Sequence, residues 1–464
     1  MLTSEPTKSN NSTSKLPDVF SLPGPKGKFL LGNLMEFEQS PLGFLTQCAQ
    51  QYGGIVPFHL GSSPSILITE PEYIEQVFKN RELFGTPKIL KVLFRTLLGQ
   101  GLLTSDGDTW FRQRRLSQPV FHQKRIAGYG EVMVAYTEKM LASWQNGETK
   151  DIQAEMMHLT FNIVMKTLFS RDATDKEAQD VALAMGLAAP WFVENRKSPF
   201  PALSKRLPTP SNRRYQSAVR QLDKYIYRII EERRSSGEDP GDLLSLMMQA
   251  RDEDDGSQMS DKQLRDAIAT LIFAGHETTA NSLAWTWMLL AQYPEVQTKL
   301  QQELQTVLGD RTPTVADLAA LQYTTMIVKE SMRLYPVVWN RVSEASQDCE
   351  LGGYKVPVGC TVIISQWVMH RSERYFENPE VFYPERWAND LEKELPKGVY
   401  APFGGGPRTC IGKSFASMEA VLLLATIAQK FELNLIPNQS IIPEPTMTLQ
   451  PKNGIKVVIN QRVK

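Results

Sequence analysis

Residues 403–412 read Phe-Gly-Gly-Gly-Pro-Arg-Thr-Cys-Ile-Gly. Three successive glycines and a proline cannot continue a helix, so they place Cys410 on a shaped loop. The segment 413–430 follows with the apolar spacing of an amphipathic helix. A thiol just before a helix N-terminus lies at the positive end of the helix dipole, and Arg408 adds positive charge two residues away. Both effects favour the thiolate, although a lone cysteine is more often apolar filling.

The composition excludes several classes of protein. Hydrophobic residues make up 42% of the 464 residues and charged residues 22%, as in a globular chain and unlike a disordered or fibrous one. The 51 basic and 51 acidic residues balance, so no nucleic-acid partner is expected. Four cysteines without a CxxC pair are too few for a disulfide framework, and they favour a reducing, cytoplasmic location.

The first residues of the chain differ in character from the rest. Residues 1–21 are polar and contain no apolar run that could serve as a signal or an anchor. We expect this segment to be disordered and residues 22–464 to form one domain, since no long linker divides them. Strand-like segments are found at 54–69, 348–365, 431–436 and 455–459. Helical patterns dominate elsewhere, so the predicted fold is mainly α, a single large helical domain with a small β-rich subdomain.

One unusually long helix is predicted in the second half of the chain. It should begin at Ser260 or Asp261, where a side chain can cap free N–H groups, and end before Pro294. Its apolar centre, residues 267–291, could suit a membrane span, but ionisable residues at mid-depth are costly there. A helix that is apolar nearly all round is better placed through the middle of a large protein.

The centre of that helix carries a polar patch, His-Glu-Thr-Thr at 276–279. It is not the zinc motif HExxH, because residue 280 is Ala. What remains is an acid beside an alcohol, Glu277 and Thr278. The pair is either a buried polar kink or a proton relay at a cofactor.

The loop at 403–412 resembles the FxxGxRxCxG haem loop of the cytochrome P450 family, because Phe403, Gly406, Arg408, Cys410 and Gly412 stand at the matching positions. Four further motifs of that family occur in the expected order. They are WxxxR (Trp110, Arg114), (A/G)Gx(D/E)T(T/S) (274–279, beginning with Ala274), ExxR (Glu330, Arg333) and PERF/W (384–387, with Arg386). The resemblance covers about residues 22–460.

The resemblance implies a monooxygenase that binds haem b and inserts one oxygen atom from O2 into a C–H bond. Cys410 would be the axial ligand of the iron, since a thiolate pushes electron density onto the metal and favours O–O cleavage. Trp110, Arg114 and Arg408 would hold the haem propionates. Ala274, Phe403, Gly406 and Gly412 would also line the cofactor site.

The resemblance also implies roles for two acidic motifs. Thr278 would hold oxygen and water by hydrogen bonds, while Glu277 would help to relay protons. Glu330 and Arg333 lie three residues apart and share a helix face. With Arg386 they would form a buried structural network that fixes the cysteine loop.

One arginine departs from the family pattern. Many relatives place a propionate-binding arginine seven residues after the proline that is Pro336 here, and that position is Ser343. Arg341 lies two residues earlier, which on a strand is the same face. Arg341 either replaces the propionate contact or projects into the pocket and pairs with a substrate carboxylate.

The substrate prediction rests on family analogy. The pocket walls would include apolar Phe94, Leu98, Val337 and Val338, which favour a lipid or a terpene. The sequence looks closest to the soluble bacterial or cyanobacterial branch with fatty-acid and alkane hydroxylases, so a long-chain fatty acid is predicted. The alternative is a sesquiterpene or another neutral hydrocarbon. A haem-thiolate isomerase, peroxygenase or haem-binding sensor is the alternative of a different class, which the intact acid–alcohol pair disfavours.

The reaction would need two electrons from NAD(P)H. They are expected from a separate ferredoxin or flavodoxin with its reductase, because no reductase domain follows the strand-rich tail. Arg408, Lys413, Lys124 and Arg125 would supply docking charge near Cys410.

A basic segment raises the question of membrane contact. Residues 196–228 hold nine basic residues and one acid, beside Trp191, Phe192 and Phe200. This pattern suits either a peripheral membrane contact or an ordinary solvated helix face. We expect a monomer.

Overall fold

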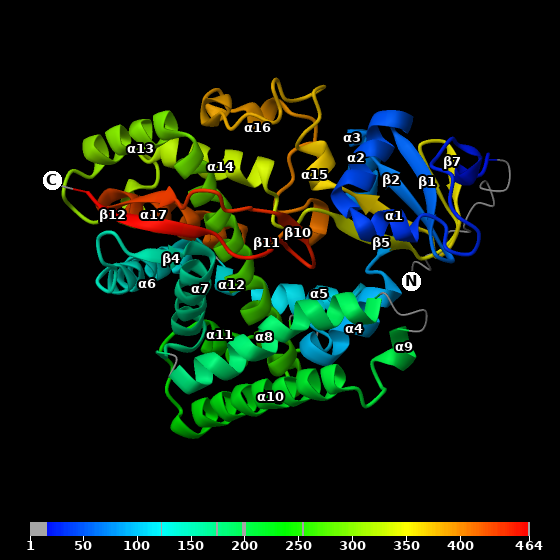
Figure 1. Ribbon diagram of the computed structural model, residues 1–464. Helices are drawn as coiled ribbons and strands as arrows, with labels where there is room; N and C mark the ends of the chain where they lie inside the picture. Colours follow the sequence, from blue (N-terminus) through cyan, green and yellow to red (C-terminus); the bar gives the residue numbers. More distant parts are fainter. Residues whose placement is uncertain (1–15, 122, 173–174, 197–200, 253–254, 463–464) are drawn as a thin grey trace, which may run out of the picture.

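The computed structural model describes residues 16–121, 123–172, 175–196, 201–252 and 255–462 (Figure 1). Helices form most of the molecule, as the sequence predicts. They are α1 (Leu34–Gln39), α2 (Pro41–Tyr52), α3 (Pro71–Lys79), α4 (Lys88–Leu98), α5 (Gly107–Ser117), α6 (Gln123–Leu141), α7 (Ile152–Phe169), α8 (Asp175–Arg196), α9 (Pro201–Ser204), α10 (Pro210–Ser236), α11 (Leu243–Gln249), α12 (Asp261–Gln292), α13 (Pro294–Val307), α14 (Gln322–Leu334), α15 (Gln366–Met369), α16 (Leu391–Glu394) and α17 (Lys413–Lys430).

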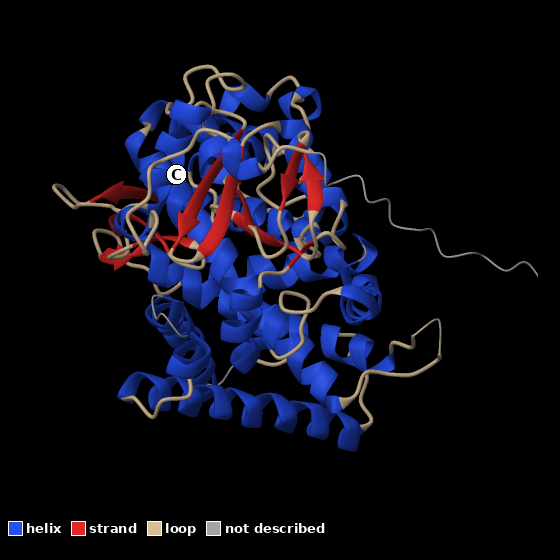
Figure 2. Cartoon of the chain, turned by 90° about the vertical axis from the view of Figure 1, so that its right-hand side faces the viewer, coloured by secondary structure: helices blue, strands red, loops and turns tan. Residues whose placement is uncertain are grey.

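The strands form one larger sheet and three small ones. They are β1 (Ile55–Leu60), β2 (Ser63–Ile68), β3 (Phe84–Gly85), β4 (Thr149–Asp151), β5 (Arg341–Ala345), β6 (Cys349–Leu351), β7 (Tyr354–Val356), β8 (Thr361–Ile364), β9 (Phe431–Leu435), β10 (Pro443–Pro445), β11 (Leu449–Pro451) and β12 (Lys456–Gln461). Figure 2 shows the strands gathered in the upper part of the molecule, while the long helix α10 runs along its base.

The larger sheet joins segments that are far apart in the sequence. Its strand order is β1-β2-β8-β5-β3, with β2 parallel to β8 and the other neighbours antiparallel. The strand pairs expected within 54–69 and 348–365 are confirmed, as are the strands near 431 and 456. The hairpin β10–β11 and the short strands β3 and β4 were not predicted, because their few residues carry no alternating pattern. The strand on which Arg341 was expected is confirmed as β5.

The predicted long helix is confirmed as α12. Ser260 caps it: the Ser260 Oγ accepts from the backbone N–H of Gln263, while the Gln263 side chain accepts from the Ser260 N–H. The helix crosses the middle of the molecule and is buried over most of its length (Figure 1). A Cβ at Gly275 would lie only 3.1 Å from the Val164 side chain of α7, so this glycine lets α7 pack closely.

The predicted range of the disordered segment, residues 1–21, extends too far toward the C-terminus. Val19 is fully buried in the core around the larger sheet, and the Asp18 side chain caps the short 3-10 turn Val19–Ser21. Residues 17–21 are therefore folded, and residues 1–15 lie outside the described part. None of the described helices is long and apolar enough to cross a lipid bilayer.

Candidate active site

The cysteine loop is shaped by two glycines with left-handed backbone conformations. Gly404 and Gly406 have φ of +70° and +65°. A Cβ at Gly406 would lie 2.1 Å from the Phe78 carbonyl oxygen, so the loop presses directly on α3. The Cys410 N–H donates to the Phe403 carbonyl at 3.0 Å, and α17 begins three residues later. The prediction that Cys410 lies on a shaped loop before a helix is confirmed.

The electrostatics of Cys410 differ in part from the prediction. Surrounding protein raises the pKa of the thiol, although its side chain is exposed. The Gly412 backbone N–H, Arg114 and Lys413 act in the opposite direction and lower the pKa. Arg408 does not contribute, because its guanidinium donates to the Ser105 carbonyl and the Asp106 carboxylate. The other cysteines are buried, as expected of core filling; they are Cys48, Cys349 and Cys360.

The expected network on α14 is present and completely buried at its centre. Arg333 donates from Nε and Nη2 to the two carboxylate oxygens of Glu330, at 2.9 and 2.8 Å. Arg386 reaches the same carboxylate at 3.3 Å, and Trp387 donates to it at 3.0 Å. Arg333 also donates to the backbone carbonyls of His370, Pro379 and Val381. Every charge in this network therefore has partners supplied by the protein itself.

A second group of charges, which are partly buried, lies against the cysteine loop. Arg114 donates to the Thr409 carbonyl at 2.9 Å. The Arg341 guanidinium lies over the Phe78 ring, and one of its Nη atoms would be 3.9 Å from a Cβ at Gly404. Burial and repulsion from Arg408 lower the pKa of Arg341 to about 10. Arg341 and Arg114 thus lie against the cysteine loop, and Arg408 is part of it. We call these three residues the loop arginines.

The loop arginines carry more positive charge than the surrounding protein neutralises. Asp106 pairs with Arg408 and is shared with Lys91. Within the described residues the Arg341 guanidinium makes no hydrogen bond or ion pair, although Asp106 attracts it at longer range, and the buried Arg408 Nε has no partner. A buried cation without a counter-charge is costly, so this cluster fits a bound group with anionic substituents. Haem b, with its two propionates, meets that requirement.

One strip of α12 is left open in an otherwise buried helix. Ala274, Gly275 and Thr278 are partly accessible, whereas their neighbours along the helix are buried. The Thr278 Oγ1 donates to the Ala274 carbonyl at 2.7 Å, which leaves the hydroxyl oxygen free to accept. An open strip of this kind fits a ligand or cofactor lying against the middle of the helix.

Glu277 lies beside this strip and is nearly buried. Burial raises the pKa of its carboxyl, and a hydrogen bond from Thr448 lowers it in part. The Thr448 Oγ1 is 2.5 Å from Glu277 Oε1. Sequence reasoning missed Thr448, because the residue lies in the tail of the chain and only the fold brings it to α12.

A second buried acid, Glu419, was also missed. It lies on α17, is fully buried, and has no hydrogen-bond partner for either oxygen within the described residues. Burial raises its pKa to about 8; the Thr279 hydroxyl, which lies near the carboxyl without forming a hydrogen bond of normal geometry, lowers the pKa only in part. The signal in the sequence that could have indicated Glu419 is that it is the single acidic residue in the apolar run after the cysteine loop.

The predicted substrate residues do not all come together. Phe94 and Leu98 of α4 join an apolar cluster with α8 and α12, in which the Phe94 ring stacks on Phe192 with centroids 4.9 Å apart. Val337 is buried in the segment before β5, while Val338 is 42% exposed. Phe94 and Leu98 therefore keep their predicted setting in an apolar wall, and Val338 faces outward.

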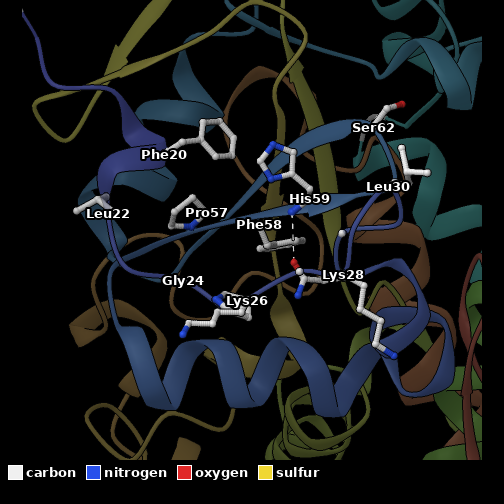
Figure 3. A pocket seen from close by; sticks show the side chains of 15 residues that line it. Phe20, Leu22, Gly24, Lys26, Lys28, Leu30, Pro57, Phe58, His59 and Ser62 are labelled. Carbon is white, nitrogen blue, oxygen red and sulfur yellow. Dashed lines mark hydrogen bonds between the residues drawn. The ribbon is translucent and has the colours of Figure 1, made fainter.

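A hollow of about 640 Å³ lies elsewhere, beside β1 (Figure 3). Phe20 and His59 line it, with ring centroids 5.0 Å apart, and Lys26 and Lys28 lie at its edge. It contains none of the predicted site residues. We assign it no part in the chemistry.

The predicted contact surfaces need correction. Trp191 stacks on Tyr215 in the core and Phe192 is buried against Phe94, so neither can enter a membrane surface. Phe200 lies outside the described residues. On the electron-donor side, Arg408 points inward to Asp106, and the side chains of Lys124 and Arg125 lie outside the described part, which leaves Lys413 exposed.

Comparisons with known proteins identify the family of the chain. The family model of cytochrome P450 matches residues 22–459. Cyclooctatin synthase of Streptomyces melanosporofaciens is 37% identical over 92% of each chain, and pentalenene oxygenase of Streptomyces avermitilis is 30% identical over 93% of this chain and 96% of the relative. The solved heme domain of cytochrome P450DA superposes with a TM-score of 0.86 at 26% identity, over 95% of this chain and 98% of that one.

The chain belongs to the cytochrome P450 family. It is a P450 monooxygenase with the mainly α fold of that family and with bacterial relatives. The family binds haem b and takes electrons from redox partners. Relatives named as oxygenases disfavour the isomerase and sensor alternatives.

Proposed function

We propose that this monooxygenase hydroxylates a neutral cyclic hydrocarbon of the terpene type rather than a long-chain fatty acid. The observation that carries this proposal is the position of Arg341. Arg341, for which a substrate carboxylate was one of two alternative partners, packs over Phe78, which belongs to a different apolar cluster from Phe94 and Leu98. An apolar wall without that cation favours an uncharged substrate.

The names of the relatives support the same choice. Pentalenene oxygenase and cyclooctat-9-en-7-ol 5-monooxygenase are named for a cyclic alkene and a ring alcohol, both uncharged. The latter is 36% identical over 89% of this chain. The alternative hydrocarbon substrate is therefore better supported than the fatty acid predicted first.

In this proposal the cysteine loop holds the haem. Cys410 is the thiolate ligand, and Phe403, Gly406 and Gly412 shape the loop around it. Arg341 and Arg408 bind the propionates together with Arg114, and Trp110 packs against the Arg408 guanidinium at 4.9 Å. When bound, the haem supplies the activation of O2. The negative charge of the propionates offsets the surplus charge of the loop arginines.

The open strip of α12 handles oxygen and protons. Ala274 leaves room against the helix, and Thr278 accepts a hydrogen bond at its hydroxyl oxygen because its hydrogen is held by the Ala274 carbonyl. Burial raises the pKa of the Glu277 carboxyl, which favours its protonated form and suits it to pass on a proton. Electrons come from a ferredoxin or a flavodoxin, and exposed Lys413 provides one positive docking contact.

Two spectroscopic measurements test this proposal. The reduced protein with carbon monoxide should show the red-shifted Soret band of thiolate-ligated haem, and Cys410→Ser should lose it. Titration with a cyclic sesquiterpene hydrocarbon should then shift the haem from low to high spin, whereas palmitate should give a weaker shift. A strong shift with palmitate that Arg341→Ala abolishes, while haem content stays constant, would overturn the choice of a neutral substrate.

A further inference from the structure

The hairpin β10–β11 connects the apolar cluster with the acid on α12. Its strands pair from Pro443 with Pro451 to Pro445 with Leu449, which leaves Thr446, Met447 and Thr448 at the tip. The Met447 side chain packs against the apolar cluster that contains Phe94 and Leu98. The next residue, Thr448, holds Glu277. One short turn therefore contacts both the apolar cluster and the acid.

The direction of the hydrogen bond at Thr448 follows from its neighbours. The Gln153 Nε2 donates to Asn281 Oδ1 at 2.9 Å, so the Asn281 amide is oriented with its Nδ2 toward Thr448. That Nδ2 lies 3.4 Å from Thr448 Oγ1, where it donates. The Thr448 hydroxyl hydrogen is then left for Glu277 Oε1, at an oxygen–oxygen distance of 2.5 Å.

This arrangement makes the two oxygens of Glu277 unequal. Oε1 is occupied as an acceptor, so a proton on this carboxyl resides on Oε2. When the proton leaves Oε2, the carboxylate that remains is stabilised by the Thr448 hydroxyl, and water can return a proton to the same atom. Asn281 is fully buried and Thr448 nearly so, which protects this geometry from competing water.

The tip of the hairpin is tied down at two further points. The Leu449 N–H donates to the Val337 carbonyl at 2.8 Å, and the Trp339 Nε1 donates to the Thr446 carbonyl at 3.2 Å. Thr446 has a hydroxyl of its own, which donates to the Thr448 carbonyl and not to Glu277. These contacts hold the tip in register with the segment that precedes β5.

We propose that Thr448 is a positioning residue that couples the filling of the apolar pocket, sensed by Met447, to the orientation of the proton-carrying Glu277. The proposal rests on the proposed monooxygenase site and deepens it. A substrate that presses on Met447 fixes the hairpin tip, and the Thr448 hydroxyl then holds Glu277 with Oε2 available. With the pocket empty, the tip has one support fewer and proton delivery is less well directed.

The test compares coupling, the fraction of electrons from NAD(P)H that appears in product rather than in hydrogen peroxide. The holoenzyme with ferredoxin and its reductase is used, with whichever of the sesquiterpene and palmitate gives the larger spin shift in the wild type. Thr448→Val should lower coupling about five- to tenfold, the loss expected for one directed hydrogen bond. The substrate dissociation constant from the spin shift should change less than about twofold, because the hydroxyl does not face the pocket.

Two matched variants separate positioning from packing. Thr448→Ser should restore coupling, since it returns the hydroxyl. Thr446→Val removes a hydroxyl that binds the Thr448 carbonyl and not Glu277, so it should lower coupling much less than Thr448→Val does. Unchanged coupling in Thr448→Val, failure of the serine variant, or an equal loss in Thr446→Val would each overturn the proposal. If Thr448→Val does not bind haem, Asn281→Leu gives the second test, because it frees the Thr448 hydroxyl to rotate and should lower coupling less steeply.

Failure of this inference and failure of the proposed substrate are distinguishable. A larger spin shift with palmitate overturns the neutral substrate, but the Thr448 series is still measured with that acid. A normal response to the sesquiterpene with no effect of Thr448→Val overturns only the positioning role.

Discussion

The network on α14 and the loop arginines are two groups of buried or partly buried charge, and they are satisfied in opposite ways. In the network on α14, the Glu330 carboxylate and the Arg333 guanidinium are fully buried and each has several protein partners. The loop arginines are also buried in part, yet in the described part of the chain only Arg408 pairs with a carboxylate, which it shares with Lys91. The first group is complete within the protein, and the second needs an external anion.

The difference separates charges that are closed on themselves from charges that, in our proposal, serve a cofactor. A charge pair that is closed on itself fixes the local fold but offers nothing to a ligand. A surplus of buried cations is costly until a ligand supplies the opposite charge. By the same criterion Glu419 forms a third case, because it has no cation beside it and avoids the cost by remaining protonated.

The largest effect is expected from breaking the closed network. Arg333→Met would leave the Glu330 carboxylate buried with Arg386 as its only ionic partner, at a cost of about 3–5 kcal/mol. We expect loss of the folded, haem-binding protein, measured as soluble yield and thermal unfolding temperature. Arg374→Met removes an exposed arginine paired with Glu70 and serves as the control. A folded Arg333→Met variant with normal haem content would show that the network is dispensable.

An intermediate effect is expected from Glu419→Gln, and it depends on pH. The Glu419 carboxyl has a pKa of about 8 in the folded protein, against an ordinary value of 4.5 that applies to the unfolded chain. Between these pH values the folded protein therefore holds a proton that the unfolded chain has released. Wild-type stability should therefore fall as the pH rises through this window and level off above about pH 8. Over the three pH units from 5 to 8, the free energy of unfolding should fall by on the order of 4 kcal/mol at most.

Denaturant unfolding at pH 5 and pH 8 measures that effect. The glutamine variant keeps the shape of the side chain without its charge, so the fall with pH should shrink in Glu419→Gln. An equal fall with pH in both proteins would show that Glu419 is ionised or solvated in the folded state.

The smallest effect is expected from removing one loop arginine. Arg341→Met should speed haem loss to apomyoglobin by about tenfold, since one charge-assisted contact is lost while Arg114 and Arg408 remain. The unfolding temperature of the haem-free protein should stay the same or rise, because an unpaired buried cation is removed. A drop in that temperature, with unchanged haem loss, would place Arg341 among the structural charges.

Local patterns were sufficient to predict several parts of the fold. The capping serine, the apolar run and the final proline defined α12 within a residue at each end. The glycines and the proline around Cys410 predicted the loop and the helix that follows it. The directions of side chains were predicted less well, because spacing along a chain does not say which way a side chain points. Arg408 and Trp191 both proved to face inward.

The sequence by itself determined the family, the haem loop and the acid–alcohol pair, because each of these lies within a few consecutive residues whose chemistry is local. Only the tertiary structure decided that Arg341 lies with Arg114 and Arg408, and that Thr448 holds Glu277, 171 residues away in the chain. Such contacts depend on how distant segments pack. The physical reason is that burial and the surrounding charges, which set the cost and direction of each polar side chain, exist only in the folded protein.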